Sequence, residues 1–204
     1  MKFKIGYLDD EMSNVRQFQR STRDDFDVIP LVVADDLKEL INNIILSQVK
    51  AIVVDYKLKT TKPNIDYSGV DVVRALDDEL KDFPSFLLTG FETDAETQLV
   101  DVNKIYCRNE YFNAPEKLNR RIRRQIENYI KEIEEIEKEY LLLKKHETLT
   151  LEQEERLIEL DDFLEKRLRN RSRVPKTIKK ISNTDKLNDL INLAKGILEE
   201  VKEL

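Results

Sequence analysis

The sequence is short of the residues that build disulfide frameworks, zinc sites and histidine-based catalytic centres. Its 204 residues include one cysteine, one histidine and no tryptophan. A lone cysteine excludes an internal disulfide, and one cysteine with one histidine is too few for a structural zinc site. No apolar run approaches the roughly 20 residues that cross a bilayer, and the amino terminus lacks a signal-peptide core. We therefore expect a soluble, cytoplasmic protein whose chemistry depends on carboxylates, hydroxyls and cations.

Composition divides the chain near Pro115. The whole chain holds 41 acidic and 35 basic residues, for a net charge of -6, and only four glycines. Up to residue 114, acidic residues outnumber basic ones and most of the aromatic residues are found there. Beyond that point Glu, Lys, Arg, Leu and Ile dominate and the charges balance. This change predicts a globular domain over residues 1–114 followed by helices.

Short apolar runs alternate with helix-period segments over the first 114 residues. Such alternation predicts an α/β domain, because parallel neighbouring strands need a crossover connection that is usually a helix. The runs are too short for helices and rich in β-branched or aromatic residues. They predict five strands, at residues 3–8, 28–33, 51–54, 86–88 and 105–107.

The ends of these strands carry the polar residues that we expect to form the functional site. In open parallel sheets, ligands bind outside the carboxyl ends of the strands. Carboxylates this close repel one another unless a cation intervenes, and oxygen ligands suit Mg²⁺. A hydroxyl and a guanidinium suit the oxygens of a phosphoryl group. The residues are Asp9, Asp10 and Glu11 after the first strand, Asp55 after the third, Thr89 and Gly90 after the fourth and Arg108 after the fifth.

The segments LDDE, VVDYKL, SGVDVVRAL and LLTGF follow one another in an order that resembles the receiver domain of bacterial response regulators. The resemblance covers about residues 1–130. It implies a flavodoxin-like, doubly wound sheet of five parallel strands, with Asp55 as the phosphoacceptor for a sensor histidine kinase or a phosphotransfer protein. It also implies Mg²⁺ held by Asp55, by Asp10 directly, by Asp9 mainly through water, and by the backbone carbonyl of Lys57. Apart from its own phosphorylation and dephosphorylation, such a protein is not an enzyme.

The resemblance also assigns residues that contact the phosphoryl group. Thr89 is the switch hydroxyl, and Gly90 offers its backbone amide. The family normally has a lysine where this chain has Arg108, and an aromatic residue where it has Ile105. The loop over residues 56–68 is longer than is usual in the family and rich in lysine, so that it could screen the acceptor or dock a partner.

Heptad spacing predicts a long helix over residues 116–145. A 3.5-residue period favours supercoiling with a partner helix, either from another subunit or folded back from the same chain. Thr150 with Gln153 forms a capping box that starts a second helix. We therefore expect residues 115–170 to form a helical hairpin or coiled coil. The heptad seam comprises Ile122, Ile126, Tyr129, Ile133, Ile136, Tyr140 and Leu143.

The end of the chain is basic and then amphipathic. We expect a basic linker over residues 171–183 and an amphipathic helix over residues 184–204. The basic residues Arg167, Arg169, Arg171 and Arg173 predict contact with a partner, an acidic protein or nucleic acid, or alternatively a solvated hinge. Dimerisation or binding of a helical protein is the expected output, and nucleic acid is the less favoured partner.

Other functions remain alternatives. A degenerate receiver would act as an adaptor or phosphate sink that scaffolds a complex without switching. A phosphatase of the haloacid dehalogenase type also uses an aspartyl-phosphate, although that class carries its nucleophile in a DxD motif. His146 at the end of the long helix would serve in phosphotransfer.

Overall fold

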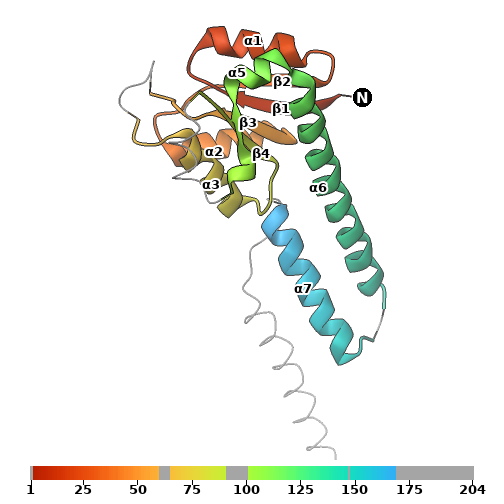
Figure 1. Ribbon diagram of the computed structural model, residues 1–204. Coiled ribbons are helices and arrows are strands. Elements are labelled where there is room, and N and C mark those ends of the chain that lie inside the picture. Colours follow the sequence, from red (N-terminus) through yellow and green to blue (C-terminus); the bar gives the residue numbers. More distant parts are fainter. Residues whose placement is uncertain (1, 60–64, 91–100, 147, 169–204) are drawn as a thin grey trace, which may run out of the picture. The chain divides into compact units, whose positions relative to one another are not determined.

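The computed structural model describes residues 2–59, 65–90, 101–146 and 148–168 (Figure 1). It contains two compact units, the first ending at Glu132 and the second beginning at Ile133. Among the described helices, none has the length and hydropathy needed to cross a membrane.

The first unit is built around a parallel sheet with the strand order β2-β1-β3-β4-β5. This is the order of flavodoxin-like doubly wound sheets, and it confirms the predicted fold class. After β1 the chain forms β2 at one edge of the sheet, and it then crosses back over β1 to form β3. The direction in which successive strands are added to the sheet therefore reverses between β1 and β3. The strands are β1 (Phe3–Leu8), β2 (Phe26–Leu31), β3 (Ala51–Asp55), β4 (Ser85–Thr89) and β5 (Ile105–Cys107).

Helices cover both faces of this sheet, as Figure 1 shows. Helix α1 (Met12–Thr22), helix α5 (Arg108–Asn113) and the first part of α6 (Pro115–Leu143) pack on one face. Helix α2 (Leu37–Leu46) and helix α3 (Gly69–Glu79) pack on the other face.

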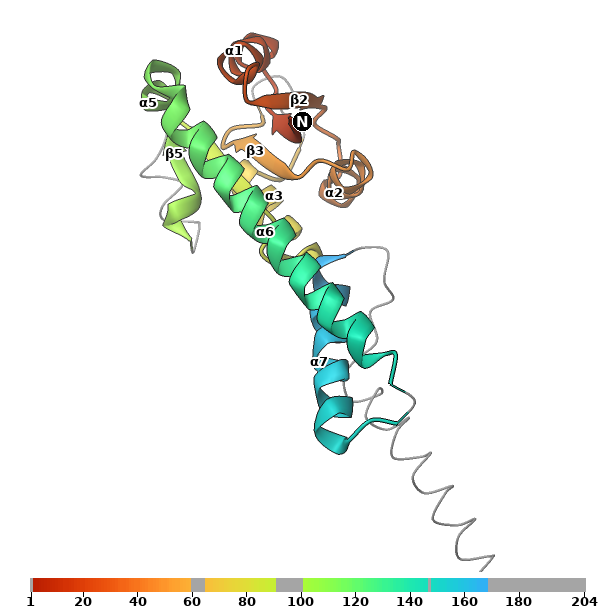
Figure 2. The same ribbon diagram turned by 90° about the vertical axis from the view of Figure 1, so that its right-hand side faces the viewer.

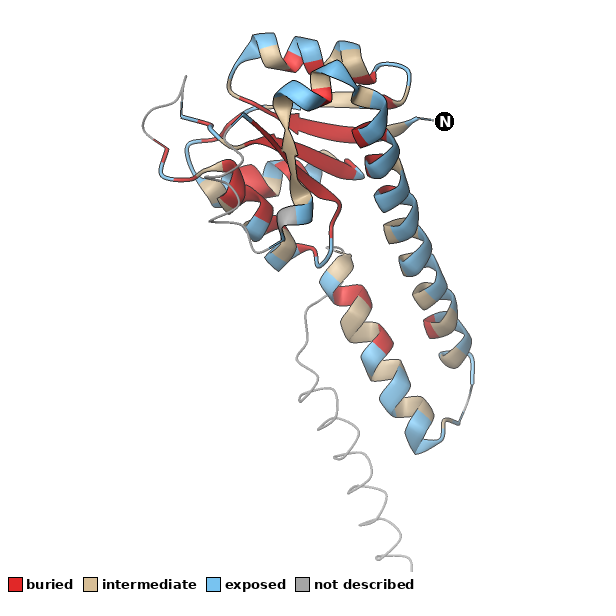
Figure 3. Ribbon diagram, viewed as in Figure 1, coloured by how far each residue is buried: buried red, intermediate tan, exposed pale blue. Residues whose placement is uncertain are grey.

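The inner strands β1, β3 and β4 are largely buried on both sides, which explains their continuous apolar runs, whereas the edge strands β2 and β5 are only partly buried (Figure 3). Successive residues of a strand point to opposite faces. Tyr7 therefore packs with α1 and α6, whereas its neighbour Leu8 packs with α2 and α3. The sheet consequently presents its polar residues only at its ends.

Three strands differ from the predicted bounds, and one of them, β4, is Ser85–Thr89 rather than residues 86–88. Strand β2 starts at Phe26 rather than residue 28 and ends at Leu31 rather than residue 33. The reason is its pairing, because β1 is the neighbour of β2 and the Leu8–Leu31 pair is the last one in register. Strand β3 extends to Asp55, which is therefore the last residue of a strand rather than a loop residue. The short helix α5 and the 3₁₀ turn Val102–Lys104 were not predicted.

The second unit contains the end of α6 and helix α7 (Leu151–Arg167), which lie side by side (Figure 2). They share an apolar cluster, so the two helices pair within one chain. Thr150 caps α7, and the predicted box with Gln153 is present, with hydrogen bonds of 3.0 and 3.3 Å. The cluster comprises Tyr140, Leu160 and Leu164, with Ile133, Ile136, Leu143, Leu157, Phe163 and Leu168 around them.

The heptad seam is thus used in two ways. Ile122 and Ile126 are fully buried in the first unit, against the sheet. Ile136 and Tyr140 pack against α7 in the second unit. Within the described chain, the seam therefore contacts the sheet and α7 and does not require a second subunit.

An exposed ion pair links α6 and α7. Arg156 donates from Nε and Nη2 to the two carboxylate oxygens of Glu139, at 2.7 and 2.9 Å. Both side chains are more than two fifths exposed, so solvent screens the pair. In a double-mutant cycle with Glu139→Gln and Arg156→Gln, we expect a coupling energy of about 0.2 to 1 kcal/mol that falls with added salt. A larger coupling, insensitive to salt, would show that the pair holds the hairpin together more than the apolar cluster does.

Several predictions concern the carboxyl-terminal residues. Arg169, Arg171, Arg173, the linker over residues 171–183 and the helix over residues 184–204 lie outside the described residues. Arg167 is described as the last residue of α7. Its guanidinium lies 3.7 Å from the centre of the Phe163 ring, a cation-π contact on its own helix.

Candidate functional site

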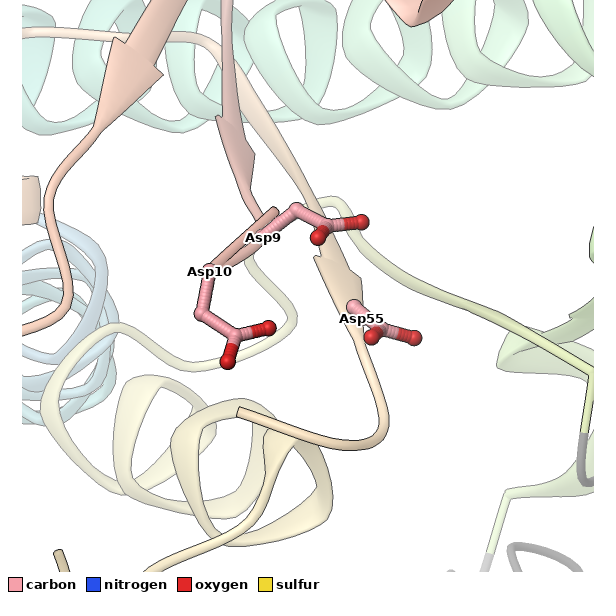
Figure 4. A group of neighbouring side chains, drawn as sticks. All are labelled: Asp9, Asp10 and Asp55. Carbon is pink, nitrogen blue, oxygen red and sulfur yellow. The ribbon is translucent and has the colours of Figure 1, made fainter. Parts of the chain in front are cut away.

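Three carboxylates meet where the strand order reverses. Asp9 and Asp10 follow β1, and Asp55 ends β3 (Figure 4). The two strands are neighbours, with Leu8 paired with Val54, so the residues that follow are brought together. One ligand oxygen from each of the three carboxylates lies within 4.8 Å of the others. The predicted acidic cluster therefore forms at the expected end of the sheet.

Asp9 is the most constrained of the three. Its side chain is fully buried. Oδ2 accepts a hydrogen bond from the Tyr7 hydroxyl at 2.8 Å, while Oδ1 accepts from the backbone N–H of Glu11 at 2.9 Å and from Nδ2 of Asn14 at 3.2 Å. Glu11 takes part through its backbone, as the residue that precedes α1. These donors hold the Asp9 carboxylate in one orientation.

Arg108 supplies the positive charge of the site. It is the first residue of α5, immediately after β5. Its Nη2 forms an ion pair with Oδ1 of Asp55 and lies 3.4 Å from Oδ2 of Asp9. Burial is the largest single effect and lowers the pKa of Arg108, but the surrounding Asp55, Tyr7 and Asp9 together raise it by more, so that the pKa lies above its usual value. Arg108 is therefore a permanent cation between two carboxylates.

Asp55 titrates at an unusually high pH. Burial raises its pKa to about 6, in spite of the opposing effect of Arg108, and the nearby charge of Asp9 also raises it. Above pH 6 the carboxylate is therefore mainly ionised.

Thr89 and Gly90 lie at the same end of the sheet. Strand β4 is the neighbour of β3, and Leu88 pairs with Asp55, so that Thr89 is the next residue in register. Thr89 is fully buried. Gly90 is exposed, and a Cβ placed on it would meet no atom of the described residues within 4 Å. The backbone of Lys57 follows two residues after Asp55.

The structure places the aromatic residue of β5 away from the acidic cluster. Tyr106 pairs with Leu88, and its ring lies 5.9 Å from that of Phe86. Arg121 of α6 covers the ring at 5.7 Å. Ile105, at the usual switch position, packs on the opposite face of the sheet. Tyr106 therefore packs with the face that contacts α6.

Lys104, the nearest lysine to Arg108, lies at the other end of β5. It lines a groove of about 670 Å³ with residues that include Asp77, Phe83 and Tyr129. Phe83 precedes β4 as Lys104 precedes β5, so the groove is at the amino ends of the strands. The groove is therefore separate from the acidic cluster, and Arg108 is the cation at the site.

The long loop after β3 is anchored where it is described. Leu58 is fully buried and Ile65 nearly so. The Tyr67 hydroxyl donates a hydrogen bond to the backbone carbonyl of Ala34. These contacts fix the two ends of the loop to the face covered by α2 and α3.

The sequence analysis missed three residues of the site. Tyr7 and Asn14 hold Asp9, and Gly69 lies against Asp55. A signal existed for Tyr7, because residues two apart on a strand point the same way and Tyr7 is the hydroxyl-bearing residue two positions before Asp9. No local sequence signal indicated Gly69, because its contact with Asp55 depends on how the start of α3 packs against the end of β3.

The donor set suits a hard divalent cation. The carboxylates of Asp10 and Asp55 and the carbonyl of Lys57 are oxygen ligands of the kind that Mg²⁺ prefers. Asp9 already accepts hydrogen bonds on both oxygens, which suits it to an indirect contact through water. The residues present therefore fit Mg²⁺.

Among solved structures, those similar to this chain include receiver domains. A beryllofluoride-activated DrrB receiver domain is 19% identical, with a TM-score of 0.47, over 62% of this chain and 99% of that one. The receiver domain of a putative LuxO repressor from Vibrio parahaemolyticus is 15% identical, with a TM-score of 0.41, over 61% of this chain and 93% of that one. The RcsB response regulator of Salmonella typhimurium is 15% identical, with a TM-score of 0.47, over 92% of both chains.

No protein-family model and no curated protein matches the chain. The fold therefore rests on the strand order described above, and the function is argued from the side chains of the site.

Proposed function

We propose that this chain is a response-regulator receiver that accepts a phosphoryl group on Asp55 from a sensor histidine kinase or a phosphotransfer protein in the cytoplasm. The observation that carries the proposal is the meeting of three carboxylates and one guanidinium at the point where the strand order reverses. Such a point is where open α/β sheets bind their ligands.

The reaction uses the ionised Asp55. One of its carboxylate oxygens attacks phosphorus, the bond from phosphorus to the donor histidine nitrogen breaks, and the imidazole leaves with the electron pair and takes up a proton. Because the pKa of Asp55 is about 6, the nucleophile is ionised at neutral pH. Thr89, the Gly90 amide and Arg108 are the donors proposed for the phosphoryl oxygens.

Mg²⁺ is the proposed cofactor. Asp10, Asp55 and the Lys57 carbonyl would hold it directly, with Asp9 acting through water. When bound, it neutralises charge on the phosphoryl oxygens. The only reactions proposed are phosphorylation of Asp55 and its reversal, so the protein is not an enzyme acting on other substrates.

We propose that phosphorylation of Asp55 affects the helices through Arg108. Arg108 begins α5, and α5 packs Tyr111 against Phe18 of α1, with ring centres 5.5 Å apart. The Tyr111 hydroxyl donates to Asn119 of α6 at 3.3 Å. A new charge at Asp55 that moves Arg108 therefore acts on the start of α6. We propose that the helical extension then binds a helical protein partner or a second copy of the chain.

A second candidate is a receiver that no longer switches and serves as an adaptor or phosphate sink. The ion pair between Arg108 and Asp55 favours it, because the guanidinium neutralises the carboxylate that would have to accept the phosphoryl group. Binding of nucleic acid by the basic residues near the carboxyl terminus is less favoured.

Treatment with acetyl phosphate and Mg²⁺ tests the proposal. We expect intact-protein mass spectrometry to show one added phosphoryl group, and Asp55→Asn to abolish it. Asp66→Asn is the matched control, because Asp66 is an exposed carboxylate in the same region and its loss should leave the adduct unchanged. Light scattering on the same samples reports dimerisation. A wild-type protein that gains no phosphoryl group would favour the adaptor.

A further inference from the structure

Arg108 differs from the other basic residues of the first unit in what surrounds it. Only 23% of its side chain is exposed, and one guanidinium nitrogen, Nη2, faces both Asp9 and Asp55. Its Nε is buried and has no hydrogen-bond acceptor among the described residues. The two carboxylates are thus the contacts that hold the guanidinium in place.

Asp9 makes this arrangement rigid. The Tyr7 hydroxyl holds the same Asp9 oxygen that faces Arg108. Tyr7 is itself fixed, because its ring stacks on that of Phe18 with centres 4.1 Å apart and planes within 7°. The carboxylate of Asp9 therefore cannot turn away from Arg108 without breaking buried contacts.

We propose that Arg108 is a built-in competitor of the divalent cation: it bridges Asp9 and Asp55 in the metal-free protein, and cation binding is coupled to the release of this bridge. The inference rests on the proposed function for the identity of the metal site. Arg108 is here a positioning residue, which acts through the two carboxylates.

Two physical effects produce the competition. The Asp55 oxygen that pairs with Arg108 belongs to the same carboxylate that would hold the cation, so the two positive groups share a ligand. In addition, a divalent cation and a guanidinium repel each other across a buried site, where the repulsion is screened less than in water. The ammonium of a lysine lies one bond closer to the backbone than Nη2 of arginine, so it would reach both carboxylates less well.

The coupling is reciprocal. If Arg108 weakens cation binding by some factor, cation binding must weaken the bridge by the same factor. Removing the guanidinium should therefore strengthen cation binding, while it destabilises the metal-free protein because the clustered carboxylates lose their counter-charge.

Titration calorimetry with Mg²⁺ alone, without a phosphoryl donor, tests the inference. Arg108→Met keeps an unbranched side chain that can fill the inner part of the arginine site and removes its charge, and we expect it to bind Mg²⁺ about 10-fold more tightly than the wild type. Arg108→Lys should fall between the two and carries the test if the methionine variant does not fold. Arg120→Ala, which removes an exposed arginine of α6, is the matched control and should bind as the wild type does.

Urea unfolding supplies a second measurement. Without Mg²⁺ we expect Arg108→Met to unfold at lower urea than the wild type, and added Mg²⁺ should stabilise the variant more than it stabilises the wild type. Equal Mg²⁺ affinity in the wild type and the variants, or weaker binding in the variants, overturns the inference. If no variant binds Mg²⁺, the competition and the proposed cofactor both fail, and the mass-spectrometric assay on Asp55 still decides phosphorylation separately.

Discussion

Replacing Gly69 with alanine is expected to lower the free energy of unfolding by about 3 kcal/mol or more, at the upper end of the usual effect of overpacking. Gly69 is the first residue of α3, and its backbone N–H donates to the carbonyl of Tyr56 at 3.0 Å. A Cβ at this position would lie 2.0 Å from the backbone oxygen of Asp55 and 3.0 Å from the Leu87 side chain. Because a backbone atom cannot rotate aside as a side chain does, either α3 or the end of β3 must shift.

The other glycines provide matched controls for this measurement. A Cβ at Gly6 would meet the tip of the Leu31 side chain at 2.6 Å, which can move, so Gly6→Ala should cost less. The Cβ of Gly90→Ala would meet nothing within 4 Å in the described part of the chain, and the variant should change stability by about 0.5 kcal/mol at most. Urea denaturation of the three variants gives their free energies of unfolding and therefore their order of stability. If Gly69→Ala were as stable as Gly90→Ala, the close approach of α3 to the end of β3 would be wrong.

Asp55→Asn is expected to make the metal-free protein more stable at neutral and alkaline pH. The pKa of Asp55 is about 6 in the folded protein and 3.8 for the unperturbed group. A raised pKa means that folding favours the protonated carboxyl, so this stabilisation is complete below pH 3.8 and lost as the pH rises through 6. The full difference corresponds to about 3 kcal/mol. Asparagine imitates the protonated form and avoids the loss.

Urea denaturation with EDTA present, repeated from pH 4 to pH 8, measures this effect. The stability difference between Asp55→Asn and the wild type should be small near pH 4 and grow through pH 6. Asp9, Asp10 and Arg108 remain in both proteins, so the difference reports Asp55 together with its interactions with these neighbours. Asp66→Asn, which changes an exposed carboxylate, should show no such increase. A variant that is less stable than the wild type at pH 8 would mean that the ion pair with Arg108 outweighs the burial of Asp55.

The two effects concern the same small region. Gly69 lies against the backbone of Asp55, and burial raises the pKa of the Asp55 carboxyl. A buried carboxylate that is stabilised less than it would be in water is typical of functional sites, which trade stability for reactivity.

Local sequence patterns were sufficient for the elements and the position of the site. The strands at residues 3–8 and 105–107 have the bounds predicted from their apolar runs. The capping box at Thr150 was predictable because it involves residues three positions apart. Strand β2 was misplaced by two residues because its bounds depend on the strand beside it, and apolar Val32 and Val33 extend the run beyond the last pair.

By itself, the sequence determined that strands and helices alternate, that carboxylates follow the first and third strands, and that a long helix begins near Pro115. These features are encoded within a few residues, in the periods of 2.0 and 3.6 that strands and helices impose. Only the tertiary structure decided that Arg108 bridges Asp9 and Asp55, that Tyr7 holds Asp9, and that the heptad seam serves first the sheet and then α7. The physical reason is distance along the chain: Arg108 and Asp9 are 99 residues apart, and the order of the strands brings them together.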